Sequence, residues 1–222
     1  MSTVLVIAPH PDDEVLGVGG TLLRHLQHGD AVHTLICTRG QTPRFSNAQV
    51  ETVQAEARRV HQFLELTGSH FLDFPAAELD RVPGADLAGA ILEVLQRVRP
   101  DTVFLPHVGD IHLDHQIIFR AAMVAARPQG AVFPRRVFCY ETVSETDWYA
   151  APSTPAFVPN VFVDITRFLE KKLAACAMYV SQMKPPPHQR SIEALKALSI
   201  ARGHAMNLPH AEAFMLVREI LR

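Results

Sequence analysis

Short apolar segments alternate along the chain with longer amphipathic segments, and this alternation restricts the fold more than any other feature. The short segments have the length of buried strands, and in the longer ones apolar residues recur three and four positions apart, as on one face of a helix. A strand followed by a helix is the unit of βαβ folds, so we expect an α/β fold with a mostly parallel sheet. The expected strands are 3–8, 31–38, 70–74, 102–106, 136–140 and 161–165. The expected helices are 11–28, 48–66, 85–98, 115–126, 166–182 and 188–203.

The composition is that of a globular protein without a strong charge. The 222 residues are 48% hydrophobic and 20% charged, with 21 basic and 23 acidic side chains. An α/β chain of this length is expected to form one domain over residues 1–222. The net charge of -2 argues against a nucleic-acid partner. No apolar run approaches the roughly 18 residues that a membrane span needs, so we expect no membrane partner.

The three cysteines are odd in number and far apart in the sequence, at Cys37, Cys139 and Cys176. This spacing makes neither a disulfide framework nor a paired-thiolate metal site, and it fits a protein of the reducing cytoplasm. The sequence leaves open whether copies of the chain associate as a homo-oligomer.

The first cluster of polar residues follows the first expected strand and reads His10-Pro11-Asp12-Asp13-Glu14. Pro11 disfavours a helical conformation at His10 and suits the first position of a helix, so the strand delivers His10 to its carboxyl end. The three acidic residues then fall in the first helical turn. There they have two interpretations: anions stabilised by the helix dipole, or ligands of a metal ion.

Glycines follow this cluster at positions 17, 19 and 20. A dinucleotide-binding loop needs its first glycine at the strand end, with bare backbone amides facing a pyrophosphate. Here carboxylates occupy that place and would repel phosphate. We therefore interpret the glycines as residues that allow close helix packing.

The second cluster follows the fourth expected strand, where the chain reads Asp110-Ile111-His112-Leu113-Asp114-His115. His112 and His115 lie three residues apart and can face the same way at a helix start, with Asp114 able to orient an imidazole. The alternative is that Asp114 only caps the next helix while its neighbours are solvated.

Together the two clusters are more informative than either alone. In doubly wound sheets a ligand crevice opens at the carboxyl ends of the strands where the strand order reverses, and the first and fourth strands commonly flank it. That topology would bring His10, Asp13, His112 and His115 to one crevice. A set of two histidines and one aspartate leaves a coordination position open, as in catalytic rather than structural zinc sites.

At these two motifs the chain resembles the LmbE-like, or PIG-L, family of zinc-dependent N-acetylglucosaminyl deacetylases, which is marked by His-Pro-Asp-Asp-Glu and a later His-x-Asp-His. The likeness covers nearly the whole chain. It implies a Rossmann-like three-layer sandwich with the metal site at the carboxyl ends of strands one and four. It also implies that zinc is held by the residues at His10, Asp13 and His115.

The same resemblance implies the catalytic roles. Asp12 would be the general base, His112 the acid or the oxyanion donor, and Asp114 the residue that holds His112. On this basis we expect a protonated His112 to stabilise the oxyanion together with zinc and to return a proton to the departing amine.

Several positions depart from the family pattern. Many members carry Thr-x-Gly-Glu after strand two, where this chain has Gln41 in place of the glutamate, and a basic residue often found early in the second helix is Val53 here. Arg44 is a candidate substitute from the adjacent loop. Some members have a tyrosine where this chain has Asp110. These changes concern the sugar and leave the hydrolytic residues in place.

The predicted function is a zinc hydrolase that removes an acetyl or similar acyl group from a small-molecule N-acyl amino sugar or its conjugate. One alternative is a metal-binding protein without turnover, which would leave Asp12 and His112 without a purpose. Another is a nucleotide-dependent oxidoreductase or methyltransferase, which the sequence disfavours because no acidic residue closes strand two. Residues 142–159, which include Tyr149 and Pro152, are expected to form a structured loop that is either a pocket wall or lid, or a packing loop.

Overall fold

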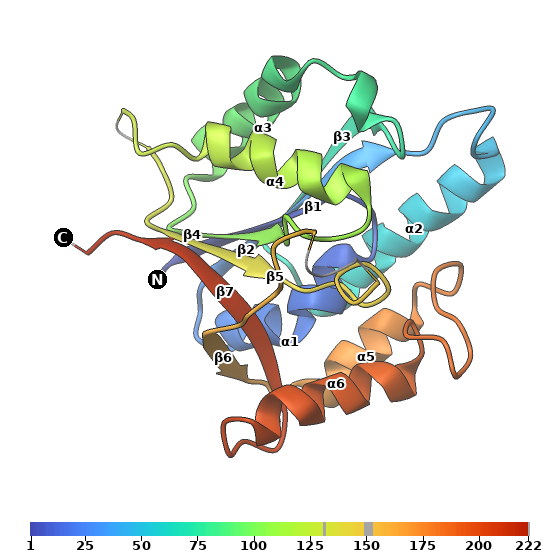
Figure 1. The fold of residues 1–222 in the computed structure, drawn as a ribbon, viewed down its shortest axis with the longest axis vertical. Helices are drawn as coiled ribbons and strands as arrows, with labels where there is room; N and C mark the ends of the chain where they lie inside the picture. Colours follow the sequence, from blue (N-terminus) through green and yellow to red (C-terminus); the bar gives the residue numbers. More distant parts are fainter. Residues whose placement is uncertain (131, 149–152, 222) are drawn as a thin grey trace.

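The protein folds around one seven-stranded sheet in the computed structural model, which describes residues 1–130, 132–148 and 153–221. The strand order is β3-β2-β1-β4-β5-β7-β6. Strands β1 to β5 pair in parallel, and β7 is antiparallel to both of its neighbours (Figure 1). The strands are β1 Thr3–Ala8, β2 Ala31–Arg39, β3 Gly68–Pro75, β4 Thr102–Pro106, β5 Arg136–Tyr140, β6 Val161–Asp164 and β7 Ala211–Glu219.

Helices cover both faces of this sheet and make the fold a three-layer α/β sandwich, as expected (Figure 1). They are α1 Asp13–Gln27, α2 Asn47–Leu64, α3 Gly84–Val98, α4 Leu113–Ala125, α5 Leu169–Ala177 and α6 Ile192–His204. Helices α3 and α4 lie on one face, and α1, α5 and α6 lie on the other. None of the helices in the described ranges is both long enough and apolar enough to cross a bilayer.

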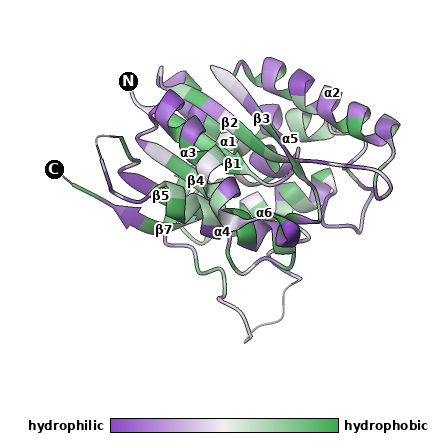
Figure 2. Cartoon of the chain, turned by 90° about the horizontal axis from the view of Figure 1, so that it is seen from above, coloured by the Kyte–Doolittle hydropathy of each residue, from purple (hydrophilic) through white to green (hydrophobic). Residues whose placement is uncertain are grey.

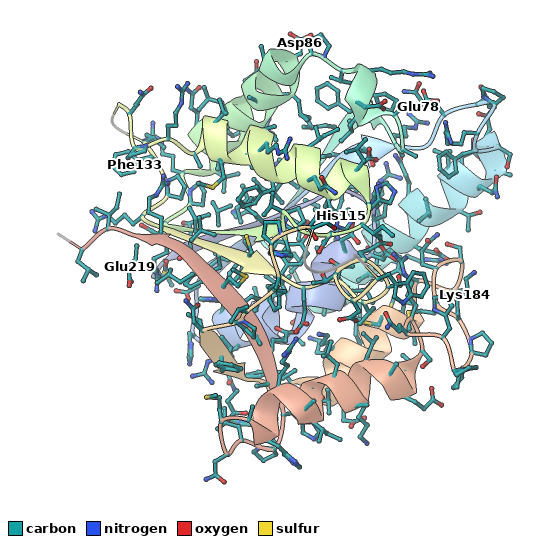
Figure 3. All side chains as sticks on the ribbon, viewed as in Figure 1. Glu78, Asp86, His115, Phe133, Lys184 and Glu219 are labelled. Carbon is teal, nitrogen blue, oxygen red and sulfur yellow. The ribbon has the colours of Figure 1, made fainter. Side chains whose placement is uncertain are left out.

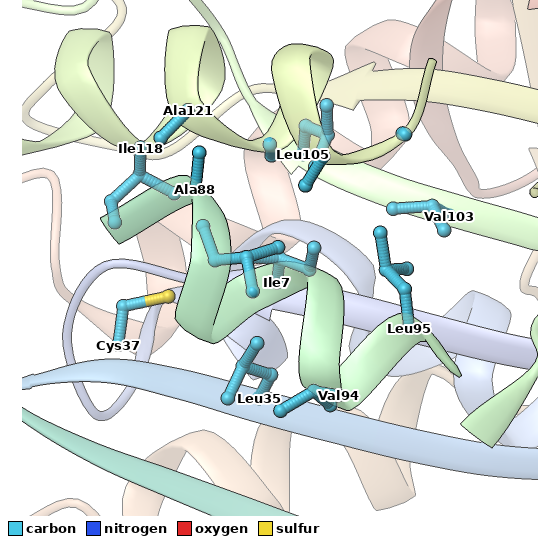
Figure 4. Close-up of a cluster of buried hydrophobic side chains, with 14 of the residues drawn as sticks. Ile7, Leu35, Cys37, Ala88, Val94, Leu95, Val103, Leu105, Ile118 and Ala121 are labelled. Atoms are coloured by element: carbon cyan, nitrogen blue, oxygen red, sulfur yellow. The ribbon is translucent and has the colours of Figure 1, made fainter. Parts of the chain in front are cut away.

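The core between the sheet and α3 and α4 is made of interlocking aliphatic side chains. Ile7 and Leu105 from neighbouring strands contact a layer that includes Leu95 of α3 and Ile118 of α4 (Figure 4). All four side chains are almost fully removed from water. Hydrophilic and hydrophobic residues alternate in short stretches along the helices, as is clear for α2 (Figure 2).

The glycines of α1 confirm the packing interpretation. A methyl group on Gly17 would overlap the ring of Tyr140, and a Cβ on Gly20 would lie 2.7 Å from Ile165. Only residues without a side chain let α1 approach β5 and the segment after β6 this closely.

Several boundaries differ from the expectation. The first helix starts at Asp13 instead of Pro11, and the two C-terminal helices, expected over 166–182 and 188–203, run from Leu169 to Ala177 and from Ile192 to His204. Strand β7 was not expected at all. Its second residue, Glu212, interrupts the apolar run, yet it is buried because it bonds to backbone amides of α1 and to Lys172.

The strand order reverses between β1 and β4, because the chain runs outward to β2 and β3 and then returns to the other side of β1. Ligand crevices of open α/β sheets lie at such a reversal, beyond the carboxyl ends of the strands. The two polar clusters of the sequence follow β1 and β4, so both lie at this crevice.

Candidate active site

Three of the predicted ligands meet at the start of α1 and α4. His10 Nδ1 and His115 Nε2 each lie 3.3 Å from Asp13 Oδ2. One ligand atom from each of the three residues can be chosen so that all lie within 4.8 Å of one another, a spacing that one metal ion can bridge. His115 lies near the centre of the molecule, at the beginning of α4 (Figure 3). The structure therefore brings His10, Asp13 and His115 together.

The far nitrogen of each of these imidazoles is bonded to a carboxylate. His10 Nε2 lies 2.9 Å from Asp114 Oδ2, and His115 Nδ1 lies 2.8 Å from Asp110 Oδ2. Histidines that bind metals usually donate their second N–H to a carboxylate in this way, which fixes the ring and the tautomer. In the sequence, Asp110 stands out only because some family members have a tyrosine at this position. Its place five residues before His115 is the signal that could have identified it as the partner of that imidazole.

Two atoms at the centre of this group lack hydrogen-bond partners among the described residues. They are Asp13 Oδ1 and His115 Nε2, and both are buried. A buried polar atom without a partner costs about 1–3 kcal/mol, so such atoms point to a missing partner. Because an anionic oxygen and an imidazole nitrogen of one compact cluster both lack hydrogen-bond partners, the donor set fits a metal cation.

The electrostatics of the three residues also favour a cation. Burial alone would lower the pKa of His10, but the carboxylates of Asp114 and Asp13 outweigh it and raise the pKa to about 9. Burial likewise opposes the charged form of His115, whose pKa is raised to about 10 by Asp13 and Asp110. In the absence of a metal the carboxylates therefore hold protons on both rings, which marks the cluster as a place of strongly negative potential.

Asp12 lies beside these residues but has different partners. It precedes α1 with a φ of 114°, and its Oδ2 accepts a hydrogen bond from Arg190 Nη1 at 2.7 Å. Burial raises the pKa of Asp12 to about 8; Arg190 opposes this rise, and the negative charges of Asp13 and Glu14 add to it. A carboxyl group with a pKa near neutral can both accept and return a proton.

Glu14 fixes the backbone that carries Asp12. Its Oε2 accepts the backbone N–H of Asp12 at 3.0 Å, and its Oε1 accepts the hydroxyl of Tyr179 and lies 3.1 Å from His61 Nε2. Sequence reasoning placed Glu14 in the first turn of the helix and missed both of these partners, as well as Arg190. All three come from segments that no local pattern connects to the motif.

His112 caps the N-terminus of α4, and its Nδ1 accepts the backbone N–H of Asp114 at 3.2 Å. In the neutral ring the proton is therefore on Nε2. Burial, together with the charges of His10 and His115, lowers the pKa of His112 to about 4. With no metal ion beside it, the ring therefore favours its neutral form at neutral pH; that His112 acts in its protonated form stays a prediction.

The side-chain contacts of Asp114 also differ from the expectation that this residue holds His112. Its carboxylate accepts the backbone N–H of Ala77 at 2.6 Å in addition to contacting His10. Only its backbone amide bonds to His112. The helix start explains the difference, because His112 occupies the capping position and takes the amide at N2.

A cavity of about 520 Å³ opens onto these residues. His10, Asp12 and His112 line it together with residues at the start of α2 and in the loop before that helix. Glu145 also lines it, so the 142–159 loop contributes one described residue to the cavity; Tyr149 and Pro152 lie outside the described residues. Arg44 is not among the lining residues and instead pairs with Glu78 at 3.2 Å.

Comparisons with known proteins agree with this geometry. Residues 5–126 match the family model described as PIG-L: GlcNAc-PI de-N-acetylase. The 1D-myo-inositol 2-acetamido-2-deoxy-alpha-D-glucopyranoside deacetylase of Mycobacterium sp. (strain JLS) is 24% identical, over 96% of this chain and 83% of that protein.

Two solved structures have folds similar to that of this chain. The conserved protein TT1542 from Thermus thermophilus has a TM-score of 0.80 and 30% identity, covering 100% of this chain and 97% of the other. The 4-carboxy-2-hydroxymuconate hydratase of Pseudomonas putida KT2440 has a TM-score of 0.78 and 21% identity, covering 100% and 98%. The fold thus occurs with more than one reaction. The match of the family model over more than half of the chain, including both motifs, shows that this chain belongs to the PIG-L family of de-N-acetylases.

Proposed function

We propose that residues 1–222 form a zinc-dependent hydrolase that removes an acetyl or similar acyl group from the amine of an N-acylated amino sugar or sugar conjugate. One observation carries the proposal. Two unpartnered buried ligand atoms, on Asp13 and His115, lie next to a separate acid, Asp12, at the edge of an open cavity. A protein that only stores metal has no need of that second acid.

The metal would be held by His10, Asp13 and His115. Two imidazoles, one carboxylate and no thiolate suit zinc, and three protein ligands leave a position open for chemistry. When bound there, zinc supplies polarisation of the amide carbonyl and lowers the pKa of a water molecule to about 7.

The chain's own residues then move the protons. Arg190 bonds Oδ2 of Asp12, which leaves Oδ1 as the oxygen that can accept a proton from the attacking water. The hydroxyl adds to the amide carbon, and the C–N bond breaks. Asp12 holds the proton until the departing amine takes it, so the products are a carboxylic acid and a free amine. Burial raises the pKa of Asp12, which helps this carboxyl group to hold the proton between the two transfers.

His112 acts in this scheme as a neutral hydrogen-bond donor. Because Nδ1 already accepts the backbone N–H of Asp114, the ring can donate a hydrogen bond only from Nε2. This Nε2–H would donate to the carbonyl oxygen as negative charge develops on it. One such donor is worth about 3–4 kcal/mol of transition-state stabilisation. The expectation that a protonated His112 delivers the proton to the amine stays a second prediction for the same residue.

The decisive experiment separates the two neighbouring aspartates. Asp12→Asn should keep its zinc and lose about 100-fold or more in kcat, which is the usual contribution of a general base. Asp13→Asn should lose zinc first, with activity partly recovered in excess zinc. Zinc content and amine release from N-acetylglucosamine conjugates are measured for both variants side by side.

Two other results for zinc content and activity would contradict parts of the proposal. An Asp12→Asn protein without zinc, beside a zinc-loaded Asp13→Asn protein, would exchange the two roles. A zinc-loaded parent protein that releases no amine from any N-acyl amino sugar tested would instead support metal binding without turnover.

A further inference from the structure

The cavity beside the catalytic residues has one wall without charge. The wall is formed by the first half of α2 and the loop residue before it, and consists of apolar, hydroxyl and amide side chains. Its members are Phe45, Ala48, Gln49, Val50, Thr52, Val53 and Gln54. We refer to these residues as the α2 wall. The charged residues of the same helix, such as Glu51 and Arg58, do not line the cavity.

The two arginines that line the cavity each have a carboxylate nearby. Arg190 donates to Asp12 at 2.7 Å and to Glu145 at 3.2 Å, so its guanidinium is committed to carboxylates. Arg39, at the other lining position, lies 3.7 Å from Asp73. An anionic substrate group would have to compete with these carboxylates for the two arginines. Arg44 does not line the cavity and pairs with Glu78. The cavity therefore offers a phosphate or carboxylate no unpaired arginine among the described residues.

An acetyl group fills only a small part of a cavity of about 520 Å³. With the scissile amide at His10, Asp12 and His112, most of the remaining space must receive the amine half of the substrate, which is the sugar and its substituent. Small-molecule sites of this size are usually lined by apolar groups with a few polar groups that set orientation, as the α2 wall is.

We propose that this enzyme selects uncharged amino-sugar conjugates whose substituent at C1 is apolar, and that the α2 wall binds that substituent. The proposal rests on the deacetylase function proposed above and specifies its substrate class. Phe45 and Val53 supply apolar contact, while the polar atoms of Gln49 and Thr52 already bond within the helix start, to Ser46 and to the backbone oxygen of Ala48. Even one methylene in an apolar pocket changes kcat/KM by about 10-fold or more.

The first test compares substrates at equal zinc content and ionic strength. Amine release is measured for the 4-nitrophenyl, methyl and 1-phosphate derivatives of N-acetylglucosamine, and for N-octanoylglucosamine. We expect kcat/KM for the 4-nitrophenyl glycoside to exceed that for the methyl glycoside and the phosphate by about 10-fold or more. Equal values for the three acetyl substrates would overturn the proposal, and so would a preference for the octanoyl amide, because the wall would then bind the acyl chain.

The second test changes the wall itself. Val53→Arg should lower kcat/KM for the 4-nitrophenyl glycoside and raise it for the 1-phosphate, so that their ratio falls by about 10-fold or more. Thr52→Arg, at an exposed position of the wall, should shift the ratio in the same direction even if Val53→Arg fails to fold. Ala55→Arg is the matched control, because it adds the same charge to an exposed position of α2 outside the cavity.

The proposal fails if Ala55→Arg shifts the ratio as much as the two wall variants do, because the effect would then be long-range charge rather than contact. It also fails if neither wall variant shifts the ratio. Failure of the deacetylase function looks different, since the parent protein would then release amine from none of the four substrates.

Discussion

Replacing Gly17 with alanine tests how tightly α1 is packed against the sheet. A methyl group at this position would overlap the ring of Tyr140 and lie 3.0 Å from the backbone oxygen of Glu141. The ring cannot easily give way, because it is fully buried and its hydroxyl donates to the backbone oxygen of Ile7 at 3.1 Å. Gly17→Ala therefore strains two neighbours, one of which is backbone.

Two effects of opposite sign determine the magnitude. Alanine is more favourable than glycine in a helix interior by about 1 kcal/mol, whereas overpacking a core costs about 1–3 kcal/mol and sometimes more. With overlap at Tyr140 and close contact at Glu141 we take the upper part of that range, so the free energy of unfolding should fall by about 1–2 kcal/mol. For a chain of this size the Tm should fall by roughly 2–8 °C.

Gly89→Ala is the matched control. Gly89 lies in the interior of α3, is exposed, and has no atom within 4 Å of the place where a Cβ would stand. Only the helix preference remains, so this variant should gain about 0.5–1 kcal/mol. Thermal unfolding is followed by circular dichroism at matched zinc content. A Gly17→Ala protein as stable as the parent, or two variants shifted in the same direction, would refute the packing argument.

The remaining predictions concern charge and metal. Lys172→Met leaves the carboxylate of Glu212 buried without its ammonium partner at 2.7 Å, so unfolding measurements should show a loss of roughly 3–5 kcal/mol. Lys171→Met, which removes an exposed charge 3.8 Å from Glu65, should change stability by less than about 0.5 kcal/mol. Chelation should abolish amine release and zinc should restore it. Replacing any one of the three buried cysteines, Cys37, Cys139 or Cys176, with alanine should leave the zinc content unchanged. A loss of zinc would contradict the ligand assignment.

The centre of the sheet could be predicted from the sequence because β1 and β4 are continuous apolar runs, as expected for strands buried on both faces. Strand β7 could not, since a glutamate at its second position looks like a surface residue until its partners are known. Glu212 accepts the backbone N–H groups of Gly20 and Thr21 and pairs with Lys172. These residues are remote in the sequence, so only the fold explains the buried charge.

The same distinction applies to the site. His10 and Asp13 lie three residues apart in one motif, and His112 and His115 lie three residues apart in another. Their clustering therefore needs only the βα order that the sequence predicts. The partners of Glu14 and Asp12 follow no such order. His61, Tyr179 and Arg190 lie 47, 165 and 178 residues from the acids they contact. A pattern search over a few residues cannot find contacts of that separation.

Three consecutive acids that composition treats as equal thus have three separate environments. Asp13 faces two imidazoles, Asp12 faces a guanidinium, and Glu14 faces a phenol and an imidazole. The φ of 114° at Asp12 lies outside the helical range, so the helix does not extend backward through this residue. Such a conformation costs a non-glycine residue about 1–3 kcal/mol and persists only where its surroundings enforce it. Here Glu14 enforces it by accepting the amide of Asp12, so the third acid, which neither binds metal nor moves a proton in our proposal, is the one that keeps the other two apart.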